Sequence, residues 1–194
     1  MDSNQPKRCP WAEGDKKMAA YHDHFWGIPL YNDQSLFGKL CLNSMQAGLR
    51  CRTIVYMWED FEKAFDNFEI SRVAAYGADK FEALIERESP IRNGKKIRAL
   101  INNANQVLKI QAEFGSFSAY LWGFVNEIPI QNHWQSRSEV PRSTPLSEEI
   151  SKDLKKRGFQ FVGPTIIYAF IQSVGLVNDH LITCHCYGGH DVRN

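Results

Sequence analysis

Two pairs of potential metal ligands lie at opposite ends of the 194-residue sequence. Cys9 and His22 lie near the start, and His180 and Cys184 lie near the end with three residues between them. On a helical turn, positions i and i+4 share one face, so the second pair can present an imidazole nitrogen and a thiolate to one ion. Two cysteines and two histidines match the closed tetrahedral coordination of structural zinc. Such an ion would tie the two ends of the chain together.

The spacing alone leaves alternatives open for this site. His24, His185 and Cys186 are rival ligands, and the same thiols and imidazoles occur in ordinary protein cores. The five cysteines cannot all form pairs, and in a reducing compartment thiols or metal ligands are expected rather than a disulfide framework.

A second candidate site, for phosphate, lies in residues 155–165. The segment reads Lys155-Lys156-Arg157-Gly158-Phe159-Gln160-Phe161-Val162-Gly163-Pro164-Thr165. Its glycines permit the tight turns of a helix–hairpin–helix, and Pro164 begins the second helix with exposed amides that can bind phosphate. A second basic group, Arg92, Lys95, Lys96 and Arg98, would extend the track. The alternative is a solvated corner whose cations complement a helix dipole.

Helical periodicity dominates the elements that must position these residues. Apolar residues recur every three or four positions, and few stretches alternate. Asn32 and Asp33 are capping candidates for the first of these helices, and Gly115 is a suitable end for the longest. The predicted helices cover residues 33–47, 53–65, 70–76, 78–88, 93–113, 146–157 and 164–175, and residues 126–146 form a loop. We therefore expect an all-α fold connected by loops rather than strands.

Composition excludes several classes of protein. With 43% hydrophobic and 12% aromatic residues, the chain is neither disordered nor collagen-like. The net charge of +1 gives no general attraction to nucleic acids or acidic membranes, so a polyanion would need locally clustered cations. The sequence shows neither a signal peptide nor a membrane span, which predicts a cytoplasmic protein with no membrane partner. Its length favours one domain.

Taken together, these pieces resemble the DNA-3-methyladenine glycosylase I family. The resemblance runs from about Arg8 to Tyr187 in the family's order and spacing. The residues that carry it are Arg8-Cys9-Pro10-Trp11, Tyr21-His22-Asp23, Trp26-Gly27, Gln46-Ala47-Gly48-Leu49, Ile91-Arg92-Asn93, Lys96-Ile97, Lys155 to Thr165, Gly175-Leu176-Val177-Asn178-Asp179-His180 and Cys184.

The resemblance implies a helix–hairpin–helix DNA glycosylase fold with a zinc-stapled terminal annex. Residues 1–194 would form a single domain with a helical core at 30–175, and the helix–hairpin–helix would lie near 146–175. Residues 1–29 and 176–194 together would form the annex. The family's zinc ligands fall on Cys9, His22, His180 and Cys184, the four residues already chosen for their chemistry.

The resemblance also assigns the base pocket and the DNA contacts. Base-binding positions fall on Trp11, Tyr21, Asn43 and Cys51, and DNA-binding positions on Gly48, Leu49, Lys155, Lys156, Gly163 and Thr165. Two pocket residues depart from the family. Asn43 replaces the glutamate of Leu-Glu-Gly-x-Gln-Ala-Gly-Leu, and Cys51 replaces a tryptophan.

The implied activity is base excision repair in the cytoplasm of a bacterium, at the nucleoid. A monomer would flip alkylated adenine out of duplex DNA and hydrolyse its glycosidic bond, leaving an abasic site and free 3-methyladenine. Tyr21 and Asn43 are the catalytic candidates. Asparagine can pair with adenine by accepting from N6 and donating to N7, so we expect Asn43 to read that edge.

Two other functions compete with this one. A lesion- or purine-binding homologue with reduced or lost catalysis would follow from the changes at Asn43 and Cys51. A helical scaffold with structural zinc would leave the hairpin glycines and lysines unexplained. Asp179 adjoins His180, so a supporting or capping role is at least as consistent with its position as catalysis.

Overall fold

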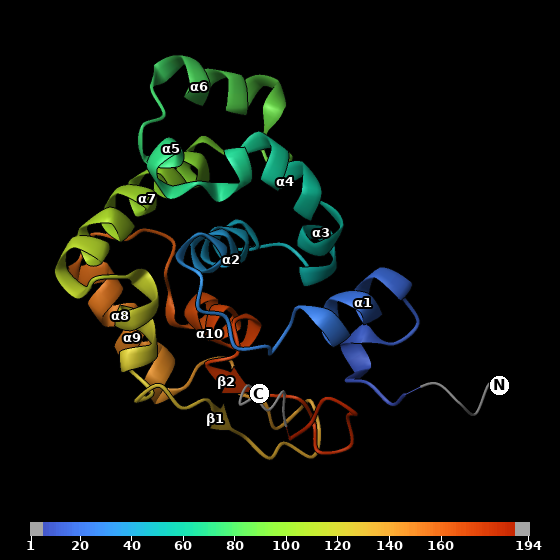
Figure 1. Ribbon diagram of the computed structural model, residues 1–194. Coiled ribbons are helices and arrows are strands. Elements are labelled where there is room, and N and C mark those ends of the chain that lie inside the picture. Colours follow the sequence, from blue (N-terminus) through green and yellow to red (C-terminus); the bar gives the residue numbers. More distant parts are fainter. Residues whose placement is uncertain (1–5, 189–194) are drawn as a thin grey trace.

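The computed structural model describes residues 6–188, and helix α2 (Asp33–Met45) lies at its centre (Figure 1). Every residue of α2 from Leu36 to Met45 is buried. The side-chain oxygen of Asn32 begins the helix by accepting from the Ser35 amide at 2.9 Å. Asp33 instead accepts from the amides of Phe117 and Ser118, which open α8 (Phe117–Gly123). The predicted start of α2 is confirmed, and Asp33 joins it to a second helix.

Short helices follow α2 along the chain, and two of them depart from the predicted boundaries. The predicted helix at 53–65 is broken at Met57 into α3 (Cys51–Tyr56) and α4 (Trp58–Ala64). After α5 (Ile70–Ala74), the predicted helix at 78–88 is regular only over α6 (Ala78–Ala83) and continues as a wider π turn at Leu84–Glu88. Apolar spacing therefore identified helical segments here without locating their breaks.

Helix α7 (Gly94–Phe114) is the long helix that the periodicity predicts. Asn93 caps it by accepting from the Lys95 and Lys96 amides, and the helix ends at Gly115 with a φ of 84°. Its buried face packs against α2, α5 and α8. Leu108 was predicted on that face but is exposed.

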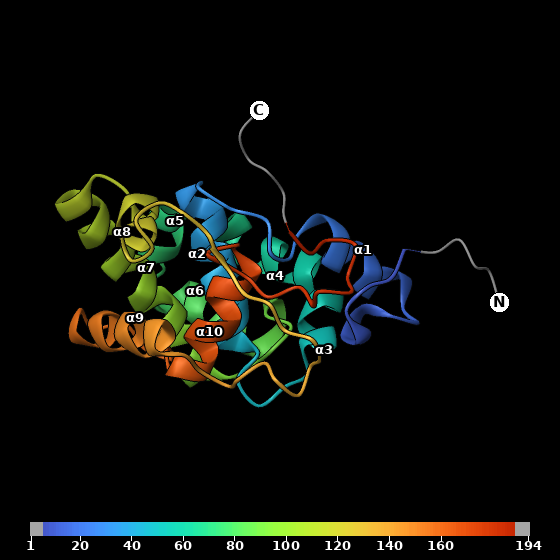
Figure 2. The ribbon, with the colours of Figure 1, turned by 90° about the horizontal axis from the view of Figure 1, so that it is seen from below.

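Helices α9 (Pro145–Lys156) and α10 (Pro164–Ser173) pack against each other, and α10 packs on α2. Thr144 and Ser147 form a capping box at the start of α9, with proline at its first position. Residues 157–163 make the turn between the two helices, which agrees with the prediction. In Figure 2, α9 lies beside α8 and α10 lies beside α2.

Two short strands correct the expectation that only loops connect the helices. Strand β1 (Ile130–Gln131) lies in the predicted loop at 126–146, and it pairs in parallel with β2 (Val177–Asn178). Nearby, the Leu30 amide donates to the Val174 carbonyl at 3.1 Å. Gly175 lies so close to the preceding segment that a Cβ there would approach the Pro29 nitrogen to 2.4 Å. The chain segments that enter and leave the predicted annex are therefore in direct contact.

The terminal segments meet at one end of the molecule. A 3-10 turn (Pro10–Ala12) and α1 (Lys16–His24), neither of which the periodicity located, lie beside the segment that follows β2 (Figures 1 and 2). Asp15 caps α1 by accepting from the Lys17 and Met18 amides. Of the predicted annex, residues 1–5 and 189–194 lie outside the described part of the chain.

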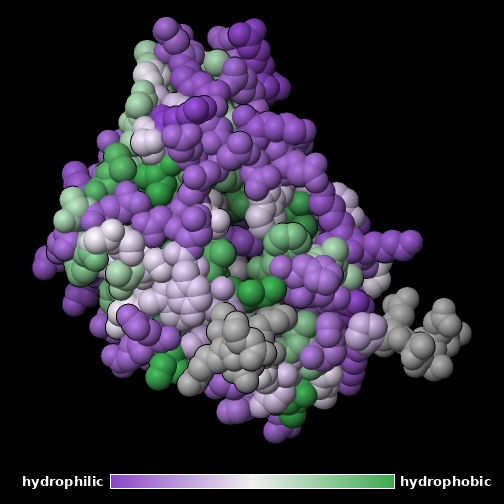
Figure 3. Space-filling view, in the orientation of Figure 1, coloured by the Kyte–Doolittle hydropathy of each residue, from purple (hydrophilic) through white to green (hydrophobic). Residues whose placement is uncertain are grey.

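The face of the molecule seen in Figure 3 is largely hydrophilic, with apolar residues in separate small patches. Within residues 6–188, no helix combines the length and apolarity needed to cross a bilayer.

Candidate functional site

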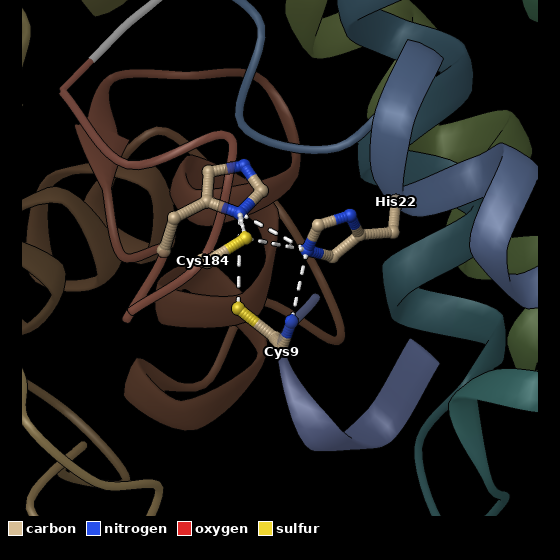
Figure 4. Close-up of side chains that lie close together, drawn as sticks. Cys9, His22 and Cys184 are labelled. Carbon is tan, nitrogen blue, oxygen red and sulfur yellow. Dashed lines mark hydrogen bonds between the residues drawn. The ribbon is translucent and has the colours of Figure 1, made fainter. Parts of the chain in front are cut away.

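Four potential metal ligands converge where the terminal segments meet. Cys9, His22, His180 and Cys184 are all buried, and their ligand atoms lie within 4.8 Å of one another. The His180 Nδ1 lies 3.2 Å from the His22 Nε2, 3.6 Å from the Cys184 Sγ and 3.7 Å from the Cys9 Sγ. A zinc tetrahedron with the usual bond lengths has edges of about 3.3 to 3.8 Å. The spacing therefore fits one tetrahedral metal ion, and Figure 4 shows Cys9, His22 and Cys184 pointing toward one another.

The orientation of His22 is fixed by Asp23. The His22 Nδ1 donates to the Asp23 carboxylate at 2.8 Å, which leaves the Nε2 lone pair directed at the cluster. Arg8 holds the same carboxylate through two nitrogens, and His185 approaches it at 3.0 Å. Burial alone would raise the pKa of Asp23, but the bonds from Arg8 and the two imidazoles hold it well below its usual range. Asp23 is therefore a charged support for a metal ligand.

The His180 ring directs its Nδ1 at the other three residues and packs tightly against Gly27 on its opposite side. Its Nε2 is buried and has no hydrogen-bond partner among the described residues. A Cβ at Gly27 would approach that nitrogen to 2.9 Å, so only glycine leaves room for the ring. The outer nitrogen of His180 thus has no supporting hydrogen bond within the described residues, unlike that of His22, which Asp23 holds.

The rival ligands occupy other positions. His185 and Cys186 lie outside the four, in a group that includes His22 and Asp23. His24 is exposed and lines a separate cavity. The structure thus brings together the four ligands that the resemblance assigned.

A cavity of about 690 Å³ lies next to this Cys/His cluster. Its wall contains all four residues predicted to bind a base: Trp11, Tyr21, Asn43 and Cys51. Burial raises the pKa of the Cys51 thiol, so Cys51 presents a neutral sulfur. Several further residues line the cavity that the sequence did not predict as pocket residues. They are Trp26, Gln46, Arg50, Arg137, Gln172 and Ser173. Trp26 and Gln46 lie within the family motifs and could have been found from them.

Asn43 presents only its carbonyl oxygen to a ligand. Its amide nitrogen donates to the Lys39 carbonyl at 2.8 Å and to the Ser173 hydroxyl at 3.2 Å. A carbonyl can only accept, so this contact fixes which end of the amide faces Lys39. Both amide hydrogens are therefore used inside the protein, and the predicted two-point pairing with adenine is wrong. Within residues 6–188 the Asn43 Oδ1 has no hydrogen bond, which leaves one acceptor for a base.

Tyr21 supplies the complementary donor. Burial raises the pKa of its hydroxyl well above the usual range, so the group keeps its proton. The described part of the chain offers that hydroxyl no hydrogen-bond partner. One donor and one acceptor, at Tyr21 and Asn43, thus remain available in a cavity with aromatic walls.

Asp179 is the only carboxylate that lines the cavity within the described residues, and its oxygens are fully used. It accepts from Asn132 at 2.6 Å, Trp134 at 2.8 Å and Gln172 at 2.6 Å, and also from the Tyr168 hydroxyl. Four donors match the capacity of a carboxylate, so Asp179 organises the cavity wall and is not a free base.

The turn between α9 and α10 is held by side chains from α7, from α2 and from α9 itself. Asn103 of α7 donates to the Gln160 carbonyl and accepts from its amide, and the Ser44 hydroxyl of α2 donates to the Phe161 carbonyl at 3.1 Å. Ser151 of α9 donates to the Val162 carbonyl at 2.6 Å. These bonds connect the turn rigidly to α2, which carries Asn43.

The predicted DNA contacts surround this turn and the loop after α2. Lys155, Lys156 and Thr165 are exposed, and Gly163 is the N-cap of α10. Gly48 has a φ of 81°, and Leu49 is 42% exposed. Exposed Arg50 and Arg137 add two cations at the cavity, and neither was among the predicted DNA contacts.

Part of the predicted basic track serves the fold instead. Arg157 pairs with Glu113 and Asp153. Lys96 donates to the carbonyls of Met45 and Ala47 at 2.8 and 2.7 Å, so it fixes the end of α2. Arg98 stacks on the Phe81 ring. Only Arg92 and Lys95 of the second group remain exposed without such contacts among the described residues.

Comparison with known proteins agrees with this geometry. The sequence pattern of the methyladenine glycosylase family matches residues 11–187. The chain is 41% identical to DNA-3-methyladenine glycosylase 1 of Escherichia coli, over 95% of this chain and 98% of that protein. It is 40% identical to the DNA-3-methyladenine glycosylase of Haemophilus influenzae, over 92% of this chain and 97% of that protein.

Solved structures match equally well. A crystal structure of 3-methyladenine DNA glycosylase I superposes with a TM-score of 0.90 at 40% identity, covering 93% of this chain and all of that one. A structure of the Staphylococcus aureus enzyme, which describes its recognition of 3-methyladenine, superposes with a TM-score of 0.90 at 36% identity. The match covers 95% of this chain and 98% of that one. The chain belongs to the methyladenine glycosylase family.

Proposed function

We propose that this protein removes 3-methyladenine from duplex DNA by hydrolysing its glycosidic bond, leaving an abasic site. The observation that carries the proposal is the convergence of Trp11, Tyr21 and Asn43 on one cavity, with α10 in its wall and α2 bonded to the turn between α9 and α10. The names of the relatives, which are 3-methyladenine glycosylases, support it.

The chemistry suits a cavity without a free acid. In DNA the 3-methylated adenine already carries positive charge, so the bond between C1′ and the base nitrogen breaks with its electron pair passing to the base. Water adds to C1′ and releases a proton to solvent. The site must extract, hold and shield the base. Trp11 and Tyr21 provide aromatic surfaces, and the Asn43 carbonyl accepts a hydrogen bond from the exocyclic amine.

The DNA backbone would lie along the turn between α9 and α10. In this proposal the two helices form the helix–hairpin–helix, and the exposed amides at Gly163 and Thr165 face a phosphate. Lys155 and Lys156 add charge without reading sequence. The loop at Gly48 and Leu49 enters the stack where the base has left, with Leu49 filling the gap.

The cluster of Cys9, His22, His180 and Cys184 would hold a structural zinc ion. Four protein ligands close the coordination sphere, so the ion supplies no reaction step and fastens the N-terminal and C-terminal segments. In this proposal the annex, residues 1–29 and 176–194, and the core, residues 30–175, form one domain. The protein acts as a monomer on bacterial DNA in the cytoplasm, at the nucleoid.

The direct test is release of 3-methyladenine from alkylated duplex DNA, measured by chromatography, with binding to an abasic-site duplex in parallel. We expect release from the alkylated duplex and none from undamaged DNA. Leu49→Ala should lower release, whereas Leu108→Ala, a substitution of a similarly exposed leucine on α7, should leave it unchanged. Tight binding without release would instead indicate a lesion-binding homologue, and neither binding nor release would contradict both.

A further inference from the structure

A lysine lies buried among aromatic rings behind the base cavity. Lys39 is on α2, one turn before Asn43, and only 7% of it is exposed. Its ammonium lies 4.1 Å from the centroid of the Trp58 ring, 4.8 Å from that of Tyr21 and 6.0 Å from that of Phe25. Three ring faces thus surround one cation, which is an unusual environment for a residue type that is seldom buried without an acidic partner.

The charge of Lys39 has little other compensation. Its single recorded hydrogen bond is a long one, 3.5 Å, to the Phe25 carbonyl. Glu62 of α4, the carboxylate whose charge acts on Lys39, accepts from the Trp58 indole at 2.6 Å and forms no ion pair with Lys39 within residues 6–188. Burial lowers the pKa of Lys39 to about 7, and the negative charge of Glu62 offsets part of that effect. Lys39 is therefore charged in slightly acidic solution and partly charged at neutral pH.

The Tyr21 ring separates this ammonium from the base cavity. Tyr21 lines the base cavity and Lys39 does not. Lys39 lines a second cavity of about 440 Å³ with Phe25 and Trp58. A base stacked on Tyr21 would therefore have the Lys39 ammonium on the other side of the ring.

We propose that Lys39 is a specificity-determining residue that makes the base cavity favour a neutral purine over a cationic one. A ring whose electron-rich face already binds an ammonium attracts a second cation less, and the two cations also repel each other directly. Asn43 contributes a carbonyl dipole instead of a full negative charge, and the Asp179 carboxylate is occupied by its four donors. The cavity thus has no free acid to offset Lys39.

This preference has a consequence for excision, and in that respect the inference rests on the proposed function. Positive charge leaves the base and moves to the sugar as the glycosidic bond breaks. A cation behind the base raises the energy of the bound substrate more than that of the transition state, so Lys39 weakens binding and assists cleavage. Removing its charge should lower KM and kcat together.

The test compares two probes that differ by one charge and one methyl group: neutral 9-methyladenine and the 3,9-dimethyladeninium cation. Their affinities for the full chain are measured by calorimetric titration at about pH 6.5, below the pKa of Lys39. Lys39→Met removes the charge and keeps the length of the side chain. Lys39→Gln is a second neutral variant, and Lys63→Met, on the exposed side of α4, removes a charge far from Tyr21.

We expect both neutral variants at Lys39 to raise the affinity for the cation about tenfold and to leave that for 9-methyladenine unchanged within about twofold. Lys63→Met should change neither. An unchanged ratio of the two affinities, or an equal change in both, would overturn the inference, because it would show a merely structural role. If the wild-type chain releases no 3-methyladenine but the ratio shifts, the proposed function fails and the role of Lys39 stands. No binding of either probe to any of the proteins would overturn the inference about Lys39, whereas release of 3-methyladenine from duplex DNA decides the proposed function separately.

Discussion

The Cys/His cluster and the cavity that contains Tyr21 and Asn43 lie side by side, but their polar atoms are used in opposite ways. In the cluster, four buried side chains direct their ligand atoms at one another, and Asp23 holds His22 from outside. In the cavity, the Asn43 carbonyl and the Tyr21 hydroxyl have no partner within the described residues. Trp11 connects the two regions: it lines the cavity, and its ring centroid lies 5.2 Å from that of His22 in the cluster.

This difference separates a site that maintains structure from one that accepts a ligand. The cluster retains every ligand that the family resemblance assigns, whereas the cavity differs from the family at Asn43 and Cys51. The scaffold is thus preserved while the charge that surrounds a base has changed. Variants that act on one region and spare the other test this separation.

The largest effect should come from Cys184→Ala, which removes one of the four metal ligands. We expect bound zinc to fall from about one per chain to none, and the free energy of unfolding to fall by at least about 3 kcal/mol. Metal analysis and denaturant unfolding measure both. Cys41→Ala is the matched control, because Cys41 is a buried thiol outside the cluster. Retained zinc in Cys184→Ala would show that another set of ligands binds the ion.

Asn43→Glu should act on the cavity alone. A carboxylate adds charge complementarity for the cationic base, so we expect kcat/KM for release of 3-methyladenine to rise about tenfold, with zinc content unchanged. Asn43→Gln, which lengthens the side chain without adding charge, should not reproduce the gain. An unchanged or lower rate in Asn43→Glu would contradict this interpretation of the pocket.

Lys39, which lies behind the cavity, should make the free energy of unfolding depend on pH. Its pKa is about 7 in the folded protein and 10.5 in the unfolded chain, so between these values the unfolded chain binds more protons. The contribution of Lys39 to stability therefore rises with pH across this window. We expect Lys39→Met to be more stable than the wild type by about 1 kcal/mol near pH 7, with the advantage shrinking towards pH 10. Urea unfolding measures this, and a constant difference would contradict it.

The smallest expected effect is on DNA binding, and it should differ between two neighbouring cations at the end of α9. Lys156 is exposed, whereas Arg157 is paired with Glu113 and Asp153. Lys156→Ala should weaken duplex binding a few-fold and lower the salt dependence by about one counterion. Arg157→Ala should reduce stability and leave the salt slope nearly unchanged. Equal slopes in both variants and the wild type, from fluorescence anisotropy, would exclude Lys156 from the DNA contact.

The sequence predicted the parts of this protein that depend on local spacing or on a shared motif. Helical periodicity located α2, α7, α9 and α10, and residue types together with the family resemblance selected the four Cys and His residues that cluster. The break at Met57 and the pairing of β1 with β2 depend on tertiary contacts that periodicity does not report.

The chemistry of individual side chains in the cavity was harder to predict. Asn43 loses one amide hydrogen to Ser173, which lies 130 residues away in sequence. Lys39 looks like any helical lysine until the rings around it are known. Such effects depend on which groups the fold leaves without partners.

The close approach at Gly175 also limits which sequences this fold can accept. Gly175 has a φ of 73°, and a Cβ there would lie 2.5 Å from the Ile28 carbonyl carbon. No flexible side chain can move aside, because the obstacle is backbone. In a library with all amino acids at this position, selection for folded protein should return glycine alone. Position 48, where a Cβ would meet no atom within 4 Å, should accept asparagine as well.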